Sequence, residues 1–495
     1  MIQQRGPGYY GQGISGLCAD RKRNANGKLD AILRRQMTSS HFKRPPASRS
    51  LAVPTAVLIV GAMLLSLLLA LVITGTPVGS EARANQTTMG NQQDPAIAVG
   101  SGGEFIVVWE SEEQDGDGYG IFARLYDSTG APKGSEFQVN TNTTGDQCNP
   151  AVSYDGGTGY IIAWQSYGDY WDGESNTTFG IFKRSFSNLG VPATPEDMLV
   201  NVDTVGNQTS PCVIAASATR YVIIWVDDET DGDGEGILGR RYSPGAQPPQ
   251  VFQVNTCTTG DQSEPDSSIA SDSSFVVVWS SDGQDGDSGG IYGQAFSSGA
   301  APQGSEFEVN TWTSGNQSAP SIAANETDCY IVVWASYGQD GDGSGIFCQM
   351  LDEDLSPVGS EFQVNTYTAG DQAQPAVAVC PNQTFVVVWS SISQDGSGAG
   401  IYGQEVKTNG DLLGSEFRVN TYTSDDQQSP DVCDSATGGY VVGWDSYLQD
   451  GDGTGIYYQR FIYTEIPEFS HLAIVVSMSA ILIMIARRKA LQNRH

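Results

Sequence analysis

Short apolar runs alternate with polar, Gly-rich segments along the middle of the chain, and seven of these runs end in tryptophan. Successive tryptophans are 55, 61, 54, 55, 55 and 55 residues apart. A fixed period of this length is typical of a solenoid, a propeller or an array of small units. The seven residues are Trp109, Trp164, Trp225, Trp279, Trp334, Trp389 and Trp444.

Each repeat contains four short β-strand patterns. In the unit at 310–365 they are 320–324, 330–334, 345–349 and 361–365. All four are rich in β-branched or aromatic residues and are bounded by Gly, Asp, Asn, Ser or Pro, which indicates strands. No amphipathic helical period occurs between them.

Four antiparallel strands in each of seven repeats predict an all-β fold, a seven-bladed β-propeller of four-stranded repeats covering 79–463. An extended array of small β-sandwiches is the alternative. A repeat of 55 residues is short for a sandwich, which usually needs about 100. The pattern therefore favours the propeller, flanked by N- and C-terminal hydrophobic helices.

The seventh repeat lacks its fourth strand, and a matching segment precedes the first repeat. Residues 78–85 (VGSEARAN) align with 358–365 (VGSEFQVN). We therefore expect the N-terminal segment to complete the last blade and close the ring. Ala82-Arg83-Ala84 is also a signal-peptidase pattern, and a cut there would remove most of this strand.

The N-terminal end is directed to a membrane. Residues 1–50 are a basic, cytoplasmic segment, with Met37 as an alternative start. Residues 51–74 are apolar and long enough to span a bilayer. Lys43, Arg44 and Arg49 precede them, so the chain that follows is exported. The segment is either a signal peptide or a transmembrane helix.

The C-terminal end at 466–489 combines Pro467-Glu468-Phe469, an uncharged apolar run and a basic cluster. This order resembles the PEF-CTERM sorting signal of archaeal surface proteins. The resemblance implies processing by an archaeosortase-like enzyme. An ordinary transmembrane anchor would give the same topology, with the propeller extracellular and the protein anchored at the cell surface.

The repeated motifs carry a second resemblance. The series EFQVNT, GDQ, VVVW, QDG and GIYGQ is similar to tandem repeats of prokaryotic secreted surface proteins. It implies extracellular display and a propeller-like fold, and it implies no established ligand.

Composition excludes several functions. A formal net charge of −32 argues against nucleic acid as a partner, because such binding needs Lys and Arg to neutralise phosphates. No histidine lies between residues 85 and 465, which excludes His-dependent catalysis and His-ligated metals there. Seven cysteines in the repeats form no CxxC pair, and their disulfide pairing is left open.

Acidic loops between the second and third strands are candidate calcium sites, since alternating carboxylates can surround a hard cation. The loop at 340–345 (DGDGSG) has the D-x-D-x-S-G order of calcium loops in integrin-type propellers, although no carboxylate occupies its ninth or twelfth position. Turns built from Gly and Asp are the alternative reading. The candidate residues are Asp115, Asp117, Asp231, Asp233, Asp285, Asp287, Asp340, Asp342, Asp395, Asp450 and Asp452.

A second loop, Gly-Asp-Gln, follows the fourth strand in several repeats. In a four-stranded antiparallel blade, it emerges on the same face as the acidic loop. The exported region also contains glycosylation sequons. Their asparagines are Asn85, Asn142, Asn176, Asn207, Asn316, Asn325 and Asn382.

The sequence favours a non-catalytic role in binding or adhesion, assisted by Ca²⁺, with an extracellular glycan or protein as ligand. A structural spacer of the envelope is the first alternative. A carboxylate-based glycosidase or lyase is the second, and it is disfavoured because the acidic residues recur in nearly every repeat whereas an active site needs one asymmetric constellation. We therefore predict that the protein is not an enzyme, and that the tryptophans pack between blades. The insertion 169–172 in the second repeat is the one predicted break in the symmetry.

Overall fold

The computed structural model describes residues 74–463, except 158, 169–177, 230, 245–249, 326–328, 381–383 and 436–437. These residues belong to one compact unit, Val72–His495. The apolar N-terminal segment up to residue 73, the sorting motif Pro467-Glu468-Phe469 and the insertion 169–172 lie outside the described residues. Within the described part of the chain, no helix is long and apolar enough to span a membrane.

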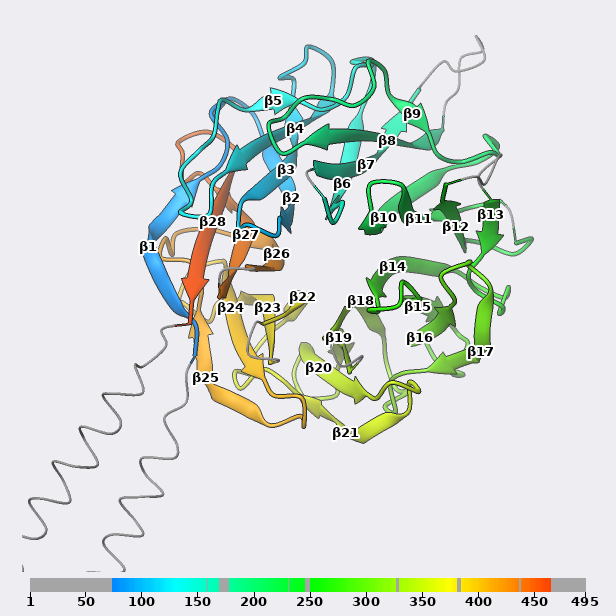
Figure 1. The fold of residues 1–495 in the computed structure, drawn as a ribbon. Helices are drawn as coiled ribbons and strands as arrows, with labels where there is room; N and C mark the ends of the chain where they lie inside the picture. Colours follow the sequence, from blue (N-terminus) through cyan, green and yellow to red (C-terminus); the bar gives the residue numbers. More distant parts are fainter. Residues whose placement is uncertain are drawn as a thin grey trace, which may run out of the picture. The chain divides into compact units, whose positions relative to one another are not determined.

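Seven four-stranded antiparallel sheets are arranged as the blades of a ring, which confirms the predicted seven-bladed propeller (Figure 1). The alternative array of sandwiches is wrong. Blade 1 contains β2 (Gln92–Val99), β3 (Phe105–Glu112), β4 (Tyr119–Tyr126) and β5 (Phe137–Gln138). Blade 2 contains β6 (Gln147–Tyr154), β7 (Gly159–Tyr167), β8 (Phe179–Ser187) and β9 (Met198–Leu199). Blade 3 contains β10 (Gln208–Ser217), β11 (Arg220–Asp227), β12 (Gly236–Tyr242) and β13 (Gln250–Gln253).

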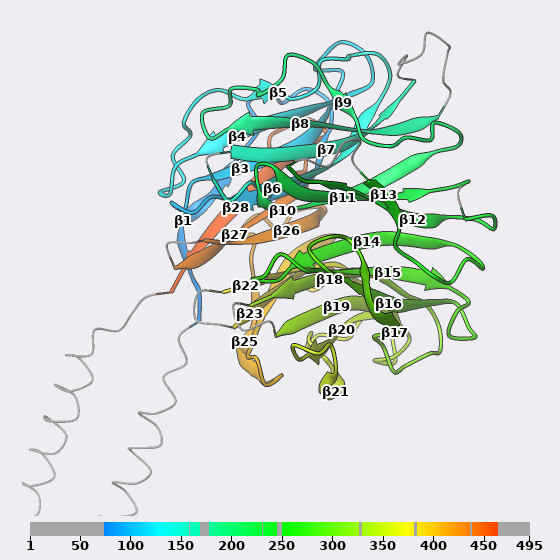
Figure 2. The same cartoon turned by 45° about the vertical axis from the view of Figure 1, so that its right-hand side comes forward.

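The remaining blades follow the same plan around the ring, as the turned view also shows (Figure 2). Blade 4 contains β14 (Gln262–Ile269), β15 (Phe275–Asp282), β16 (Gly289–Phe296) and β17 (Pro302–Glu308). Blade 5 contains β18 (Gln317–Ala324), β19 (Tyr330–Tyr337), β20 (Ser344–Leu351) and β21 (Pro357–Gln363). Blade 6 contains β22 (Gln372–Val379), β23 (Phe385–Ile392), β24 (Ala399–Val406) and β25 (Leu412–Arg418). Blade 7 contains β26 (Gln427–Ser435), β27 (Gly439–Tyr447), β28 (Thr454–Ile462) and β1 (Thr76–Arg83).

The second strand of each blade forms the core, because both of its faces are covered by neighbouring blades. In β3 every residue except the last is buried. The seven repeat tryptophans are completely buried. Trp164, for example, packs with Ile106 and Val108 of the preceding blade. The predicted packing role of the tryptophans is therefore confirmed.

An asparagine and a glutamine lock each blade to the next. Asn140 Nδ2 donates to Gln147 Oε1 over 2.7 Å, and its Oδ1 accepts from the Ile121 N–H over 2.9 Å. Both residues are buried, so these bonds are shielded from water. The same pairing occurs at all seven junctions, through Asn85, Asn140, Asn201, Asn255, Asn310, Asn365 and Asn420. This lock explains the recurring VNT and GDQ motifs.

The ring closes through β1, as the sequence predicts. Strand β1 pairs antiparallel with β28, from Thr76 opposite Ile462 to Arg83 opposite Tyr457. The Ala84 N–H then donates to Ile456 O over 2.7 Å, and Asn85 Oδ1 accepts from the Ile456 N–H. Ala84 is completely buried. A cut after Ala84 would therefore remove the outer strand of blade 7.

Candidate functional site

The acidic loops and the Gly-Asp-Gln loops lie together on one face, which confirms the predicted placement. The second aspartate of the acidic loop accepts a hydrogen bond from a backbone N–H of the other loop. Asp117 Oδ2 accepts from the Gly145 N–H over 3.1 Å. In blades 4 and 5, Asp287 Oδ2 and Asp342 Oδ2 accept from the equivalent glycines over 3.0 and 3.3 Å.

The first aspartate of the loop stabilises the turn itself. Asp285 Oδ1 accepts from the Asp287 N–H over 3.1 Å, and Asp340 Oδ1 accepts from the Asp342 N–H over 3.2 Å. In blade 6, where Ser397 replaces the second aspartate, its Oγ accepts from the Asp425 N–H. A hydroxyl thus replaces the carboxylate in the same contact. These are the backbone contacts expected of an Asp-Gly turn.

The arrangement does not by itself form a calcium site. Among the described residues, no group of three or more His, Cys, Asp or Glu side chains could hold a metal ion. Calcium takes six to eight oxygen ligands. In blade 4 the two aspartates of the Asp-Gly-Asp motif are both bonded to backbone N–H groups. Calcium binding stays a prediction.

The predicted glycosylation sites differ in exposure. Asn316 is exposed, while Asn142 and Asn207 are half-buried. Asn85 and Asn325 are buried, and Asn85 is part of the lock that joins blade 7 to blade 1. Asn176 and Asn382 lie outside the described residues. The cysteines of the described region are free thiols: Cys148, Cys212, Cys257, Cys329, Cys348, Cys380 and Cys433.

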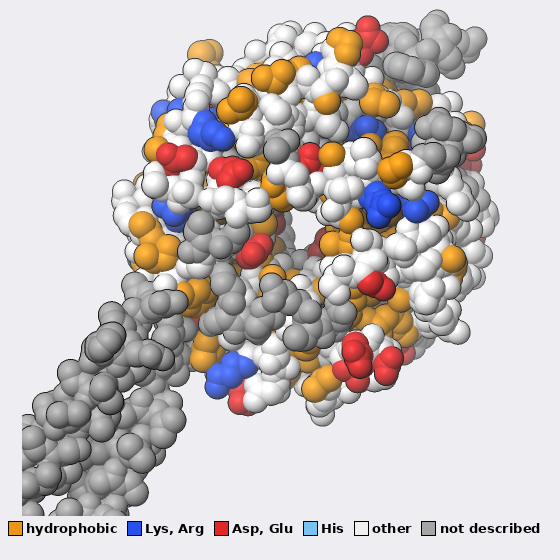
Figure 3. Space-filling view, in the orientation of Figure 1, with side chains coloured by type: hydrophobic (Ala, Val, Ile, Leu, Met, Phe, Trp, Pro, Cys, Tyr) orange, Lys and Arg blue, Asp and Glu red, His pale blue; other side chains and the backbone are white. Residues whose placement is uncertain are grey.

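A cluster of carboxylates that was not predicted from the sequence lies on the first and second strands of blade 1 and the second strand of blade 7. It consists of Asp94 in β2, Glu110 in β3 and Asp445 in β27. The space-filling view shows an opening at the centre of the ring (Figure 3), and the first strand of each blade lies nearest to the centre in the ribbon view (Figure 1). Glu110 and Asp445 directly follow the repeat tryptophans; the other blades have Gln165, Val226, Ser280, Ala335 and Ser390 at this position. The acidic side chains at this position thus come from two adjacent blades only.

Hydrogen bonds fix the cluster without neutralising it. Glu110 Oε2 accepts from the Asn149 N–H over 2.9 Å, and Oε1 accepts from Gln93 Nε2 over 2.8 Å. Asp94 Oδ1 accepts from Ser429 Oγ over 3.0 Å. Among the described residues, the one ion pair is Arg83 with Asp450. No Lys or Arg of this part of the chain therefore compensates the cluster.

Burial raises the pKa of all three carboxyls, and the charge of Asp94 raises the pKa of the other two further. Burial raises the pKa of Glu110 to about 7, and the charge of Asp94 adds to the effect. Burial also raises the pKa of Asp445 to about 7, again with a contribution from Asp94, whose own pKa is raised by burial. At neutral pH the cluster therefore holds both protonated and ionised carboxyls. Such a set can donate and accept protons, as general acid–base catalysis requires.

Two residues of this cluster, Glu110 and Asp445, each replace the uncharged residue that follows the tryptophan in the other repeats. Comparing the position after each tryptophan across the repeats would have found Glu110 and Asp445. The sequence-based predictions instead concerned the recurring aspartates and the insertion at 169–172.

No family model matches the chain, and no curated protein matches it. Solved structures are similar in fold. One is a protein of unknown function from Dyadobacter fermentans, with 8% identity, a TM-score of 0.47, and coverage of 79% of this chain and 99% of that one. Another is an α-L-arabinanase from Penicillium chrysogenum, with 11% identity, a TM-score of 0.45, and coverage of 63% and 92%. A third is the NanB sialidase of Streptococcus pneumoniae, with 7% identity, a TM-score of 0.42, and coverage of 78% and 70%.

These comparisons correct the prediction that the protein is not an enzyme. Several of the similar structures are glycosidases. At such identities the likeness is one of fold alone and transfers no activity to this chain.

Proposed function

We propose that the protein binds an extracellular glycan or protein ligand at the cell surface, and that it presents its acidic-loop face outward. The observation that supports this orientation is the pairing of β1 with β28, in which Thr76 lies opposite Ile462. The chain therefore enters and leaves the ring at one place, the outer edge of blade 7. The apolar segments of the sequence adjoin these two ends.

The direction of β28 decides which face lies near the two ends. The acidic loop with Asp450 and Asp452 precedes β28, and the strand then runs to Ile462 at the opposite face. Anchoring at either end would hold that opposite face towards the membrane. The loops at 115–117, 285–287 and 340–342 would then face the medium.

Epitope insertion tests this orientation. One epitope is placed in the acidic loop after Gly341, and a matched one in the turn after Glu353, which joins β20 to β21 on the opposite face. We expect antibody to bind the first epitope on intact cells far better than the second, with equal binding after solubilisation. The reverse preference would refute the orientation. A glycan array would then separate a binder from an envelope spacer, which captures no glycan.

A second candidate function, glycoside hydrolysis, is supported by the carboxylate cluster of blades 1 and 7. Paired carboxyls with different protonation states are the machinery of most glycosidases. Glu110 and Asp445 have a raised pKa and come from adjacent blades. Under this candidate, the inner opening of the ring would receive the sugar chain.

Release of reducing ends from a panel of polysaccharides tests the second candidate. We expect Glu110→Gln to reduce the turnover rate by about 10³-fold or more, since it removes a proton-transferring group. Glu264→Gln is the matched control. Glu264 has the same position in blade 4 that Asp94 has in blade 1, and it is distant from the cluster in sequence. Absence of turnover by the unaltered chain on every substrate would eliminate the candidate.

A further inference from the structure

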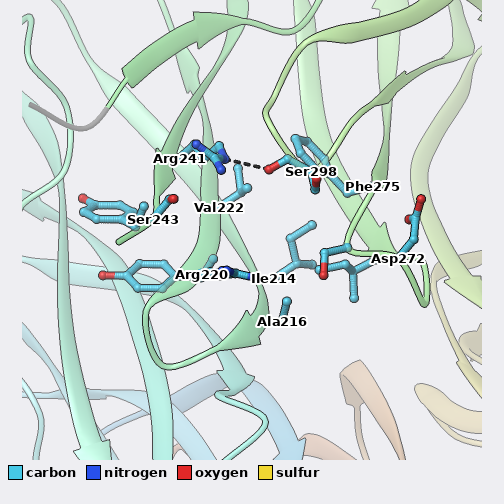
Figure 4. A pocket seen from close by; sticks show the side chains of 13 residues that line it. Ile214, Ala216, Arg220, Val222, Arg241, Ser243, Asp272, Phe275 and Ser298 are labelled. Atoms are coloured by element: carbon cyan, nitrogen blue, oxygen red, sulfur yellow. Dashed lines mark hydrogen bonds between the residues drawn. The ribbon is translucent and has the colours of Figure 1, made fainter. Parts of the chain in front are cut away.

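A pocket of about 250 Å³ lies between blades 3 and 4, on the face opposite the acidic loops (Figure 4). It is formed by the β10–β11 turn, the β14–β15 turn and the end of β12. The floor is apolar and includes Ile214, Val222 and Phe275. A cavity of this size suits a ligand of about one sugar ring rather than a drug-sized molecule.

Two arginines provide the charge of the pocket. Arg220 and Arg241 lie on one side, and Asp272 lies on the other (Figure 4). The Asp272 carboxylate is exposed and accepts from the Ser274 N–H over 2.8 Å. No ion pair joins either arginine to a carboxylate among the described residues. The hydroxyls of Ser243, Ser273 and Ser298 complete the polar lining.

With the residues that the structure describes, Arg241 makes one hydrogen bond, and its terminal nitrogens keep hydrogen-bonding capacity for a ligand. Its Nε donates to Ser298 O over 2.8 Å. Arg460 occupies the equivalent position in blade 7, opposite Val441 as Arg241 lies opposite Val222. Both terminal nitrogens of Arg460 donate to carbonyls of blade 1, those of Thr129 and Ser128. A purely structural arginine in this position is thus bonded through its terminal nitrogens, whereas Arg241 is bonded through Nε.

Positive charge is concentrated in blades 2 and 3 of an otherwise acidic chain, and two of these cations, Arg220 and Arg241, line the pocket. Five of the eleven Lys and Arg residues between positions 74 and 463 belong to blades 2 and 3, namely Lys183, Arg184, Arg220, Arg240 and Arg241. The net charge of the whole chain is −32. Arg220 and Arg241, which form no ion pair with the described residues, can attract an anion despite the negative total, because the nearest charges dominate at ordinary ionic strength.

A buried lysine lies against two of the aromatic rings that line the pocket. Tyr221 and Tyr242, which line the pocket, stack with ring centroids 4.4 Å apart. Lys183 Nζ lies 5.4 Å and 5.0 Å from these rings, and the side chain is 4% exposed. Burial and the nearby charge of Arg240 lower the pKa of Lys183 to about 8.

We propose that this pocket binds a single acidic sugar unit. Arg220 and Arg241 would bind its carboxylate, since guanidinium groups match carboxylate geometry and remain charged. The serine hydroxyls would bind the sugar hydroxyls, and the apolar floor would receive the C–H face of the ring. The site is independent of the proposed outward face and of the carboxylate cluster.

Calorimetric titration of the full chain in detergent tests the proposal with three probes: galacturonate, galactose and inorganic sulfate. We expect galacturonate to bind, and to bind at least tenfold more tightly than either other probe. Affinity should fall in 0.5 M salt, because screening weakens the charge contact. Equal binding of galacturonate and galactose would overturn the proposal, as would sulfate binding equal to that of galacturonate.

Variants locate the site. Arg220→Ala should weaken galacturonate binding by tenfold or more, and Arg220→Lys should restore part of it. Arg220 is an exposed residue at the start of β11, so the fold should tolerate the change, which an unchanged melting temperature would show. Lys407→Ala is the matched control, since it removes one positive charge from the same face in blade 6. Unaltered affinity in Arg220→Ala would refute the assignment.

Discussion

The acidic loops and the carboxylate cluster both consist of aspartate or glutamate side chains, yet they differ in how often they recur and in their surroundings. The loop aspartates recur around the ring, and their carboxylates accept backbone hydrogen bonds within and between loops. Glu110 and Asp445 occur in two blades, are buried, and have a raised pKa. A residue that is repeated in each blade stabilises the repeat. A residue that departs from the repeat is the better candidate for function.

The basic pocket of blade 3 supports the same conclusion from the opposite charge. Arg220 precedes the buried strand run in blade 3, where other blades have residues such as Glu104, Ser274 and Thr384. The pocket and the carboxylate cluster are thus two separate departures from one framework.

Removal of the closing strand should have the largest effect. A chain that begins at Thr87 lacks β1 and also the two residues that follow it, buried Ala84 and the lock residue Asn85. We expect its free energy of unfolding to fall by about 4 kcal/mol or more relative to a chain that begins at Thr74, because several buried hydrogen bonds are lost. Chemical denaturation measures this difference. Equal stability of the two chains, or a mature N-terminus at Asn85, would contradict closure by β1.

Loss of one blade lock should have a similar effect in any blade. Asn365→Ala removes the bond from Nδ2 to Gln372 Oε1 and the acceptor for the Ile346 N–H. We expect a loss of about 3 kcal/mol, since buried partners remain unsatisfied. Asn140→Ala in blade 1 is the matched comparison, measured by the same denaturation. A difference greater than about 1.5 kcal/mol between the two variants would show that the locks are not equivalent.

Glu110→Gln should change how stability depends on pH. The folded-state pKa of Glu110 is raised from 4.5 to about 7, so the folded state holds its proton more tightly than the unfolded state. This contribution to stability is complete below about pH 4.5 and is lost as pH rises through about 7. Gln165 shows that glutamine fits this position, because its Oε1 accepts from the Ser210 N–H just as Glu110 accepts from Asn149.

We therefore expect Glu110→Gln to match the unaltered chain at pH 4.5 and to be more stable at pH 8 by about 2 kcal/mol. Thermal melting across this pH range measures the effect. Gln165→Glu is the reciprocal variant, and it should lose stability as pH rises. Parallel pH profiles for the unaltered chain and Glu110→Gln would contradict the raised pKa.

Calcium should have the smallest effect on stability. If the loop at 340–345 binds it with a Kd of about 10⁻⁴–10⁻³ M, as extracellular modules do, 1 mM calcium stabilises the fold by about 0.5–1.5 kcal/mol. Chelator should lower the melting temperature slightly, and Asp340→Ala should reduce that response. Identical melting with and without calcium would leave these loops as turns alone.

The sequence by itself determined the repeated part of this protein. Period, strand pattern and buried tryptophan are properties of each repeat, so they can be read locally. Closure was also predictable, because residues 78–85 match the strand that the seventh repeat lacks. The common face of the two loops followed from strand alternation within a blade.

The tertiary structure decided which departures from the repeat meet. Glu110 and Asp445 lie at opposite ends of the repeat region in sequence, and ring closure makes their blades neighbours. Arg241 meets Ser298 because the blade 4 turn packs against blade 3. The tertiary structure also determined that the recurring aspartates accept hydrogen bonds from backbone N–H groups. Such encounters depend on contacts between distant segments and on burial, which the pattern of a single repeat does not contain.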